Sequence, residues 1–532
     1  MSETLGAFLD EACARAPERE AVACAPHDRV TVRMTWRALH EASRLAARRL
    51  VAAGAGKGTR VGLLGPNGPE WLPLAFGALR IGAVLVPFST LWKRDEIAYA
   101  LTHGDVQLLL MRRGFLKHDY LAHLEALAPE LATATPGRLY AAAAPALRRL
   151  VLLGDAHTSG TERWDALESD VPDAVLDGLE RAVSPTDVAT VFFTSGTTAQ
   201  AKAVVHAHAA LVASGRRVGD CLGVTPDDAW WGHMPLFWSG GFVIGALAPM
   251  AGGGRLVLQE QVDAGAALAL LEAEGCTIMA GWHQAGPLLE HPDFARARLR
   301  LRKGSNHPLA EQLLGPDHLA VGMYGMSETA TCVACARVDD PPEIRRGTFG
   351  RPLPGMEIRI VDPESGALVA PGGSGEIFVR GPTLMEGYYR VPRAQAFDRD
   401  GFFKTGDLGF LDAQGCLHFA TRLKDVIKTA GVNVAAVEVE EALARHPAVK
   451  SAHVVGVPHP VRGENVTAFV VLEPGAVVDS AALVAFCRAA LAAYKVPRHV
   501  FVIEAAAVPR TGTGKVEKPA LRRLAIERVG ST

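Results

Sequence analysis

Apolar and polar positions along the first third of the chain alternate in blocks that predict helices and strands in turn. Residues 36–53 carry apolar side chains at helical spacing and stop at Gly54, whereas residues 61–64 form a short apolar run typical of a buried strand. The order then repeats as a helix at 71–81, a strand at 83–88, a helix at 94–103 and a strand at 106–111. This succession predicts βαβ units and a largely parallel sheet with helices on both faces.

The same pattern continues further along the chain. An alanine-rich stretch with several prolines, residues 116–146, is interpreted as a surface insertion with some helix. Strand-like runs follow at 149–153, 188–193, 255–258 and 277–280, with helical stretches between them. We therefore expect a doubly wound α/β domain.

The pattern of apolar and polar positions changes beyond Gly347. Residues 357–361 and 376–379 alternate like antiparallel strands and predict a smaller β subdomain. Near Arg422 a further α/β unit begins. Its expected helices are 435–445 and 480–492, and its expected strands are 449–455, 467–472 and 500–503. The predicted fold class is thus α/β, with a large N-terminal domain of doubly wound sheets and a small C-terminal domain.

Composition narrows the possible functions. The 532 residues exceed the roughly 250–300 at which a single core stops growing, so at least two domains are expected. A net charge of −2 argues against binding nucleic acid through bulk charge. The N-terminus lacks the pattern of a signal peptide, which predicts a cytoplasmic protein. Prolines and glycines interrupt the uncharged run at 233–254, so a buried loop and helix is expected there and no membrane span. The pair Cys332 and Cys335 is interpreted as two half-buried thiols.

A loop rich in hydroxyls follows the strand at 188–193. Residues 194–202 hold four hydroxyl side chains, one glycine and Lys202, groups that bind phosphate at a strand-to-helix turn. Ala201 and Ala203 stand where a Walker A motif needs glycine and a hydroxyl, which excludes a P-loop NTPase. An ordinary surface turn remains the alternative for this stretch alone.

Four later clusters carry groups suited to nucleotide chemistry. Ser327 and Glu328 follow the apolar run 319–321, so they should lie just past a strand end, where open α/β sheets bind ligands. Glu328 suits Mg²⁺ beside phosphates, or else it is only an acid at a helix start. Asp407 follows a tight turn and suits ribose hydroxyls, although a Gly-Asp pair on its own is usually a plain β-turn. Two basic stretches follow. Seen alone, residues 422–428 are typical of a solvated strand edge, and residues 509–515 are typical of a mobile linker.

The order and spacing of these clusters resemble the adenylate-forming (ANL) superfamily, in its acyl-CoA synthetase branch. The similar segments are 193–202, 235–241, 324–328, 405–407, 422–431 and 509–515, and the resemblance covers nearly the whole chain. It implies an N-terminal domain at 1–421, with its β subdomain at about 347–421, a mobile C-terminal domain at 425–532 and a hinge at 422–424. It also implies two steps: a carboxylate attacks the α-phosphorus of ATP, and a thiol then displaces AMP. The implied cofactors are ATP or acyl-AMP, Mg²⁺ and coenzyme A, and the implied partner is a small carboxylic acid.

The resemblance implies a role for each matched residue. Lys202, Glu328 and Lys515 would be catalytic. Glu328 would be the metal ligand, and Lys515 would neutralise charge growing on the attacked phosphoryl group. Lys424 would be the hinge, and Lys428 and Gly431 would lie near CoA. The nucleotide would contact Thr194, Ser195, Gly196, Thr197, Thr198, Ser305, Asn306, Tyr324, Gly325, Ser327, Asp407 and Arg422. The acyl pocket would include Trp238, Gly240 and Trp282.

The phosphate loop departs from the family pattern. Ala199, Ala201 and Ala203 stand in a segment that the family writes Gly-x-Pro-Lys-Gly. An added Cβ would cost ~1–2 kcal/mol wherever the backbone is left-handed. Three hypotheses follow: a complete acyl-CoA ligase, an enzyme that performs only thioesterification of a preformed acyl-adenylate, or an adenylation enzyme that loads a carrier protein. The retained Lys515 favours the first.

Two indoles stand in the segments that build the acyl pocket in the family. Trp238 replaces a histidine often found in its motif, and Trp282 follows residues 280–281. An apolar lining favours a hydrophobic acid. The alternative is that both indoles only fill the core.

Overall fold

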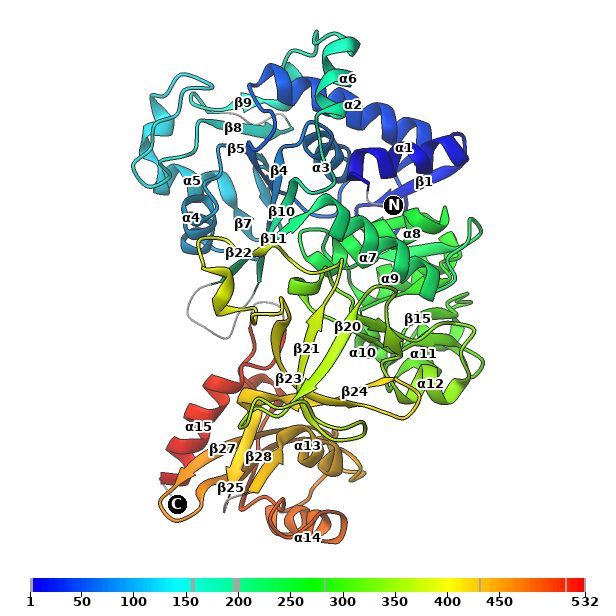
Figure 1. Cartoon of the computed structure of the whole chain (residues 1–532), viewed down its shortest axis with the longest axis vertical. Helices are drawn as coiled ribbons and strands as arrows, with labels where there is room; N and C mark the ends of the chain where they lie inside the picture. Colours follow the sequence, from blue (N-terminus) through cyan, green and yellow to red (C-terminus); the bar gives the residue numbers. More distant parts are fainter. Residues whose placement is uncertain are drawn as a thin grey trace. The chain divides into compact units, whose positions relative to one another are not determined.

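The computed structural model describes residues 3–154, 158–194, 201–281, 284–429, 432–511 and 514–530 (Figure 1). Its contacts divide the chain into two compact units. The first holds Met1–Thr194, Ala201–Glu357 and Arg380–Phe403, and the second includes Ile358–Val379 and Lys404–Thr532. The hinge predicted at 422–424 and the boundary that it implies stay predictions.

The first unit contains an eight-stranded sheet. Its strand order is β22 (Gly387–Tyr388), β11 (Lys202–Ala207), β10 (Val188–Thr194), β4 (Val84–Phe88), β3 (Arg60–Leu64), β5 (Leu108–Arg112), β8 (Arg149–Leu153) and β9 (Glu162–Arg163). Strands β10, β4, β3, β5, β8 and β9 run parallel, whereas β11 pairs antiparallel with β10 and β22 antiparallel with β11. The parallel part matches the predicted βαβ units.

A seven-stranded sheet forms the other half of this unit. Its strand order is β16 (Leu319–Val321), β15 (Lys303–Ser305), β14 (Ile278–Met279), β12 (Ala229–Gly232), β13 (Arg255–Gln259), β1 (Glu20–Ala25) and β2 (Val32–Thr35). All neighbours pair in parallel except β2, which is antiparallel to β1. A small sheet of β17 (Met323–Tyr324), β18 (Ala334–Cys335) and β19 (Arg351–Pro352) follows β16.

Helices connect these strands. They are α1 (Leu5–Arg15), α2 (Trp36–Ala52), α3 (Trp71–Arg80), α4 (Arg94–His103), α5 (Tyr120–Leu127), α6 (Asp173–Arg181), α7 (His208–Cys221), α8 (Ala248–Gly252), α9 (Ala264–Glu274), α10 (Ala285–Glu290), α11 (Ala310–Leu314) and α12 (Pro342–Gly347). Their ends follow capping rules: the Thr35 side chain accepts the Ala38 N–H at the start of α2, and Gly275 ends α9 in a left-handed conformation. Helix α3 has no exposed face, because all of its residues are buried.

The second unit holds two sheets. The first has the order β20 (Glu357–Val361), β21 (Gly375–Arg380), β23 (Phe403–Leu411) and β24 (Leu417–Arg422). The second joins β25 (Val426–Thr429), β26 (Val432–Ala435), β27 (Val449–His459), β28 (Gly463–Leu472) and β29 (His499–Val502). Its helices are α13 (Ala436–Ala444), α14 (Ser480–Ala490) and α15 (Lys518–Gly530). The predicted α/β fold class, with its smaller β and C-terminal parts, is confirmed.

Two local expectations need correction. The described element that follows β10 is a strand and not a helix, because residues 202–207 are rich in β-branched and apolar side chains that pair antiparallel with β10. The insertion at 116–146 is also less superficial than expected, since Leu131 and Leu139 belong to the core cluster of the eight-stranded sheet.

The uncharged run folds as expected, whereas the two cysteines are more buried than expected. Residues 240–252 of the uncharged run form a mostly buried π-helix, η3 (Gly240–Leu247), followed by α8. Within the described ranges, no helix has the length and apolarity needed to cross a membrane. Cys332 and Cys335 are free thiols, and both are fully buried rather than half-buried.

Candidate active site

The turn that carries Ser327 and Glu328 lies just past the end of the seven-stranded sheet, as predicted. Residues Ser327–Thr329 form a short 3-10 turn, η5, directly after β17. Ala330 and Thr331 then adopt positive φ angles of 43° and 80°, which residues other than glycine rarely do. Such strained backbone persists only where surrounding contacts hold it, and it clusters at functional sites.

Two side chains from other elements hold Ser327. The Oγ of Ser239, which precedes η3, lies 2.8 Å from the Ser327 Oγ. The fully buried His206 on β11 donates its Nε2–H to the Ser327 carbonyl at 2.6 Å. Burial lowers the pKa of His206 to about 4, so the ring is neutral near pH 7. The segment predicted to build the acyl pocket therefore joins the segment predicted to bind the nucleotide.

Lys202 and Glu328 meet through a third residue, Tyr388 on β22. The Tyr388 hydroxyl donates to Glu328 Oε1 at 2.7 Å. The Lys202 ammonium lies 4.6 Å from the centre of the Tyr388 ring, within the range of a cation–π interaction. Both predicted catalytic residues of the first unit are thus in one cluster.

The residues predicted to face the nucleotide base lie at neighbouring strand ends. Ser305 on β15 pairs with Val321 on β16, and the Asn306 N–H donates to the Val321 carbonyl at 2.7 Å. Tyr324 is buried and packs edge-on against Phe349, with ring centres 6.2 Å apart. The Asn306 side chain donates to the Arg346 carbonyl at 2.9 Å, so it also has a structural task.

Gly325 and Thr194 complete the described nucleotide residues of this unit. A Cβ at Gly325 would collide with the Thr331 carbonyl, so only glycine fits at this point of the turn. Thr194 ends β10 opposite Lys202, and its hydroxyl is 3.4 Å from the Lys202 carbonyl. Gly325 thus belongs to the tight turn that carries Glu328, and Thr194 lies beside Lys202.

The predicted acyl-pocket segment is held by Asn67. Its side chain donates to the carbonyls of Gly232 and Met234 and accepts the Leu236 N–H at 2.9 Å. Trp238 is partly buried and packs edge-on against the Phe237 ring at 5.7 Å. The next segment, η3, is a π-helix, an irregularity that is frequent at functional sites.

The second unit holds a separate group of predicted residues. Asp407 on β23 pairs with Arg422 on β24, and the carboxylate lies 3.4 Å from the guanidinium. Asp407 is buried, whereas Arg422 is exposed. Desolvation and then the positive charge of Arg422 lower the pKa of Lys515. Asp407 and Arg422 are therefore neighbours, and the charge of Arg422 acts on Lys515.

The hinge and CoA residues lie further along the same unit. Lys424 belongs to the 3-10 turn η7 (Leu423–Asp425), which connects β24 to β25. Lys428 is exposed on β25, and its backbone N–H donates to Glu464 at 2.9 Å. The predictions for Ser195, Gly196, Thr197, Thr198, Trp282 and Gly431 fall outside the described residues.

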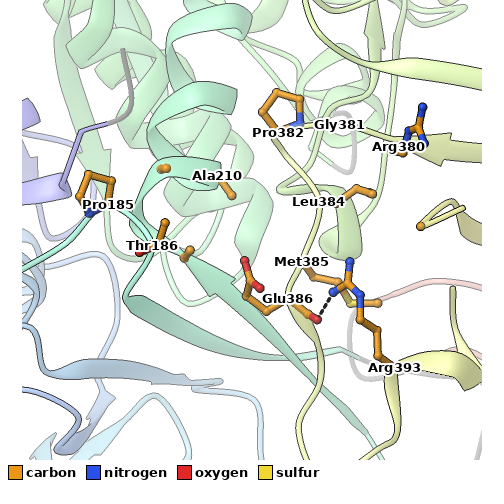
Figure 2. Close-up of a pocket in the computed structure, with 13 residues that line it drawn as sticks. Pro185, Thr186, Ala210, Arg380, Gly381, Pro382, Leu384, Met385, Glu386 and Arg393 are labelled. Carbon is orange, nitrogen blue, oxygen red and sulfur yellow. Dashed lines mark hydrogen bonds between the residues drawn. The ribbon is translucent and has the colours of Figure 1, made fainter.

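Tyr388, His206 and Ser239 were not predicted from the sequence. They reach the Ser327–Glu328 turn from positions 60, 121 and 88 residues away along the chain, so no local motif marks them. A cavity of about 380 Å³ lies beside the segment that carries Tyr388, and its lining includes Met385, Glu386 and Arg393 (Figure 2). None of the predicted site residues lines it.

The described residues fit Mg²⁺ but not an all-protein metal cage. Within the described ranges there is no group of three or more His, Cys, Asp or Glu side chains that could hold a metal. Mg²⁺ instead binds through one or two carboxylates plus substrate phosphates and water. Glu328 supplies one such carboxylate, with Oε1 engaged by Tyr388. The metal would neutralise phosphate charge.

Comparison with known proteins identifies the family. The family described as AMP-binding enzyme matches residues 9–389, and its C-terminal domain family matches residues 438–515. The chain therefore belongs to the AMP-binding (ANL) superfamily, and it is an AMP-forming acid–thiol ligase of the acyl-CoA synthetase branch.

Individual relatives span nearly the full length. The 3-[(3aS,4S,7aS)-7a-methyl-1,5-dioxo-octahydro-1H-inden-4-yl]propanoyl:CoA ligase of Rhodococcus jostii is 34% identical over 509 residues, 92% of this chain and 94% of the relative. The sulfoacetate–CoA ligase of Cupriavidus necator is 32% identical over 502 residues, 91% of each. The crystal structure of ATP-bound MatB from Rhodopseudomonas palustris matches with a TM-score of 0.80 at 25% identity, covering 98% of this chain and 99% of that one.

Proposed function

We propose that this acyl-CoA ligase performs both half-reactions, forming an acyl-adenylate from ATP and a hydrophobic carboxylic acid and then transferring the acyl group to CoA. In the first step an acid oxygen attacks the α-phosphorus and pyrophosphate leaves. In the second step the CoA sulfur attacks the acyl carbon, its proton is lost and AMP leaves. The observation that carries the proposal is the Lys202–Tyr388–Glu328 cluster, which keeps a cation and a carboxylate together beside the predicted phosphate loop.

The roles of the side chains follow from their charge. In the proposal, Lys202 binds phosphate oxygens, and Glu328 is the magnesium ligand. Lys515 neutralises the charge that grows on the attacked phosphoryl group, and Asp407 accepts hydrogen bonds from ribose hydroxyls. Preorganised charges of this kind stabilise a transition state without reorganising during the reaction.

The alanines of the phosphate loop do not argue against adenylation where they are described. Ala203 lies in β11, pairs with Phe193 and is buried. Ala203 has no positive φ angle, so its Cβ atom carries no left-handed penalty. This weakens the case for an enzyme restricted to thioesterification, and the retained Lys515 supports the same conclusion.

A hydrophobic acid is supported by the partly buried indole of Trp238 next to Phe237 and the mainly apolar π-helix that follows. Family membership does not decide the acid. The two relatives of 34% and 32% identity are named for an indenyl propanoyl group and for sulfoacetate, which differ widely in polarity. The side chains of this pocket are therefore the better guide.

Two measurements on the purified protein test the function. Exchange of labelled pyrophosphate into ATP should occur with a hydrophobic acid, because exchange requires a reversible first step. Free CoA should then give the acyl-CoA product. Product from supplied acyl-adenylates without any exchange would indicate the thioesterification-only enzyme. Turnover with carrier proteins but not with CoA would indicate the loading enzyme.

The pocket assignment has its own test. Trp238→Ala should shift the preferred acid toward bulkier members of a homologous series, because the indole volume becomes available. Trp230→Phe on β12, where the indole is fully buried, serves as a control for altered packing. Unchanged acid selectivity in Trp238→Ala would remove Trp238 from the pocket.

A further inference from the structure

We propose that Tyr388 is a positioning residue that fixes the Glu328 carboxylate for magnesium and holds the Lys202 ammonium beside it. The proposal rests on the magnesium role given to Glu328 under the proposed function. It adds a residue outside the family motifs that the sequence matched. It also makes the first half-reaction depend on a phenol that need not touch the substrate.

Two contacts carry the inference. The phenol hydroxyl donates to Glu328 Oε1 at 2.7 Å, a hydrogen bond to an ionised acceptor. This bond restricts rotation of the carboxylate and leaves Oε2 for a cation. The face of the same ring lies 4.6 Å from the Lys202 Nζ. One side chain thereby orients an anion through its edge and a cation through its face.

The backbone on both sides of Tyr388 is anchored. Strand β22 pairs with β11, with Tyr388 opposite Val204, and the Met385 N–H donates to the Glu328 carbonyl at 2.8 Å. The guanidinium of Arg393 donates to the carbonyl of Glu386, which precedes Tyr388 by two residues (Figure 2). Tyr388 therefore sits on a fixed strand and not on a loose loop, which is what orienting a ligand requires.

Metal binding tests the proposal directly. Mn²⁺ affinity is measured by electron paramagnetic resonance in the presence of the non-reacting analogue α,β-methylene-ATP. Tyr388→Phe keeps the ring but removes the hydroxyl, and it should weaken Mn²⁺ binding by roughly 10-fold, as loss of such supporting hydrogen bonds does in metal sites. Tyr388→Leu should weaken it at least as much and should also weaken binding of the analogue without metal, since Lys202 loses its ring.

The neighbouring tyrosine provides a matched control. The Tyr389 hydroxyl donates to Asp105 at 2.6 Å, outside the Glu328 cluster, so Tyr389→Phe removes an equivalent hydroxyl from the same segment. It should leave Mn²⁺ affinity within about twofold of the wild type. Equal Mn²⁺ affinity in Tyr388→Phe and the wild type would overturn the inference. Equal losses of Mn²⁺ affinity in Tyr388→Phe and Tyr389→Phe would also overturn it. Failure of the proposed function is distinguishable, because the wild type would then bind Mn²⁺ with the analogue yet give no pyrophosphate exchange.

Discussion

Single residues in this chain divide into those that a motif reveals and those that only tertiary contacts reveal. Ser327, Glu328 and Lys202 could be predicted because each sits at a set place after a strand. Tyr388 and His206 could not, because each acts on a partner 60 or 121 residues away and neither carries a local pattern. A chemical role that depends on contact across sheets leaves no periodic signal in the sequence.

Lys515 gives a prediction in its pH dependence. The ammonium form neutralises phosphoryl charge, so pyrophosphate exchange should fall as pH rises through the Lys515 pKa. Because that pKa is lowered from the 10.5 of an ordinary lysine, the fall should begin at a lower pH than an ordinary lysine would give. Lys515→Arg should move this alkaline limb upward, since arginine keeps its charge. Lys515→Ala should lower exchange by roughly 10²–10³-fold. An alkaline limb identical in the wild type and Lys515→Arg would contradict the assignment.

Helices and strands could be predicted from the sequence pattern more completely than single side-chain contacts could. The succession of helical spacing and short apolar runs predicted the parallel strands and their helices, and helix α4 has the predicted bounds. Strand β11 was missed because a turn rich in hydroxyls was expected to lead into a helix. Strand β22 has two residues, too few to show any period, and exists only through its pairing with β11.

The two glycines at the start of η3 give a matched pair of variants. A Cβ at Gly241 would collide with the Pro235 carbonyl, whereas a Cβ at Gly240 would meet no atom within 4 Å. Gly241→Ala should therefore lower the free energy of unfolding by ~1–3 kcal/mol and raise the KM for every acid, because the turn must shift. Gly240→Ala should keep wild-type stability and, if Gly240 lines the acyl pocket, discriminate against the bulkiest acids only. Denaturant titrations and acid-series kinetics check both, and equal effects of the two variants would refute the argument.

The buried histidines of the β11–α7 segment predict an acid-sensitive stability. Burial lowers the pKa of His206 and His208 to about 4 from 6.5, so the unfolded chain binds more protons between these values. Stability should thus rise with pH from about 4 to 6.5 and be lost as pH falls, by on the order of 1–2 kcal/mol per histidine at pH 5. His206→Gln keeps a donor for Ser327, and His208→Asn keeps an acceptor for the Leu5 N–H. The double variant should flatten the acid side of a stability–pH profile, and an unchanged slope would contradict this origin.

At the scale of the whole molecule, the resemblance implied a large and a small domain joined by a hinge, and the rotation about that hinge stays a prediction. The structure shows one arrangement of Asp407 and Arg422 within the second unit. The two half-reactions have different needs, since the first requires a cation at the phosphates and the second requires access for a thiol. Enzymes with such needs commonly alternate between conformations through a few hinge residues.

Lys424 allows the hinge to be tested separately from the chemistry. It lies in the short turn η7 between β24 and β25, where few residues would have to change φ and ψ. Proline fixes φ near −65°, so Lys424→Pro should hold the backbone in a turn conformation. Pyrophosphate exchange should then stay within about threefold of the wild type, while CoA thioester formation falls by more than about 10-fold. Lys424→Ala removes the same ammonium without restricting φ and should retain both activities. A parallel loss of both half-reactions in Lys424→Pro, or thioester formation at the wild-type rate, would show that rotation at this residue does not separate the two steps.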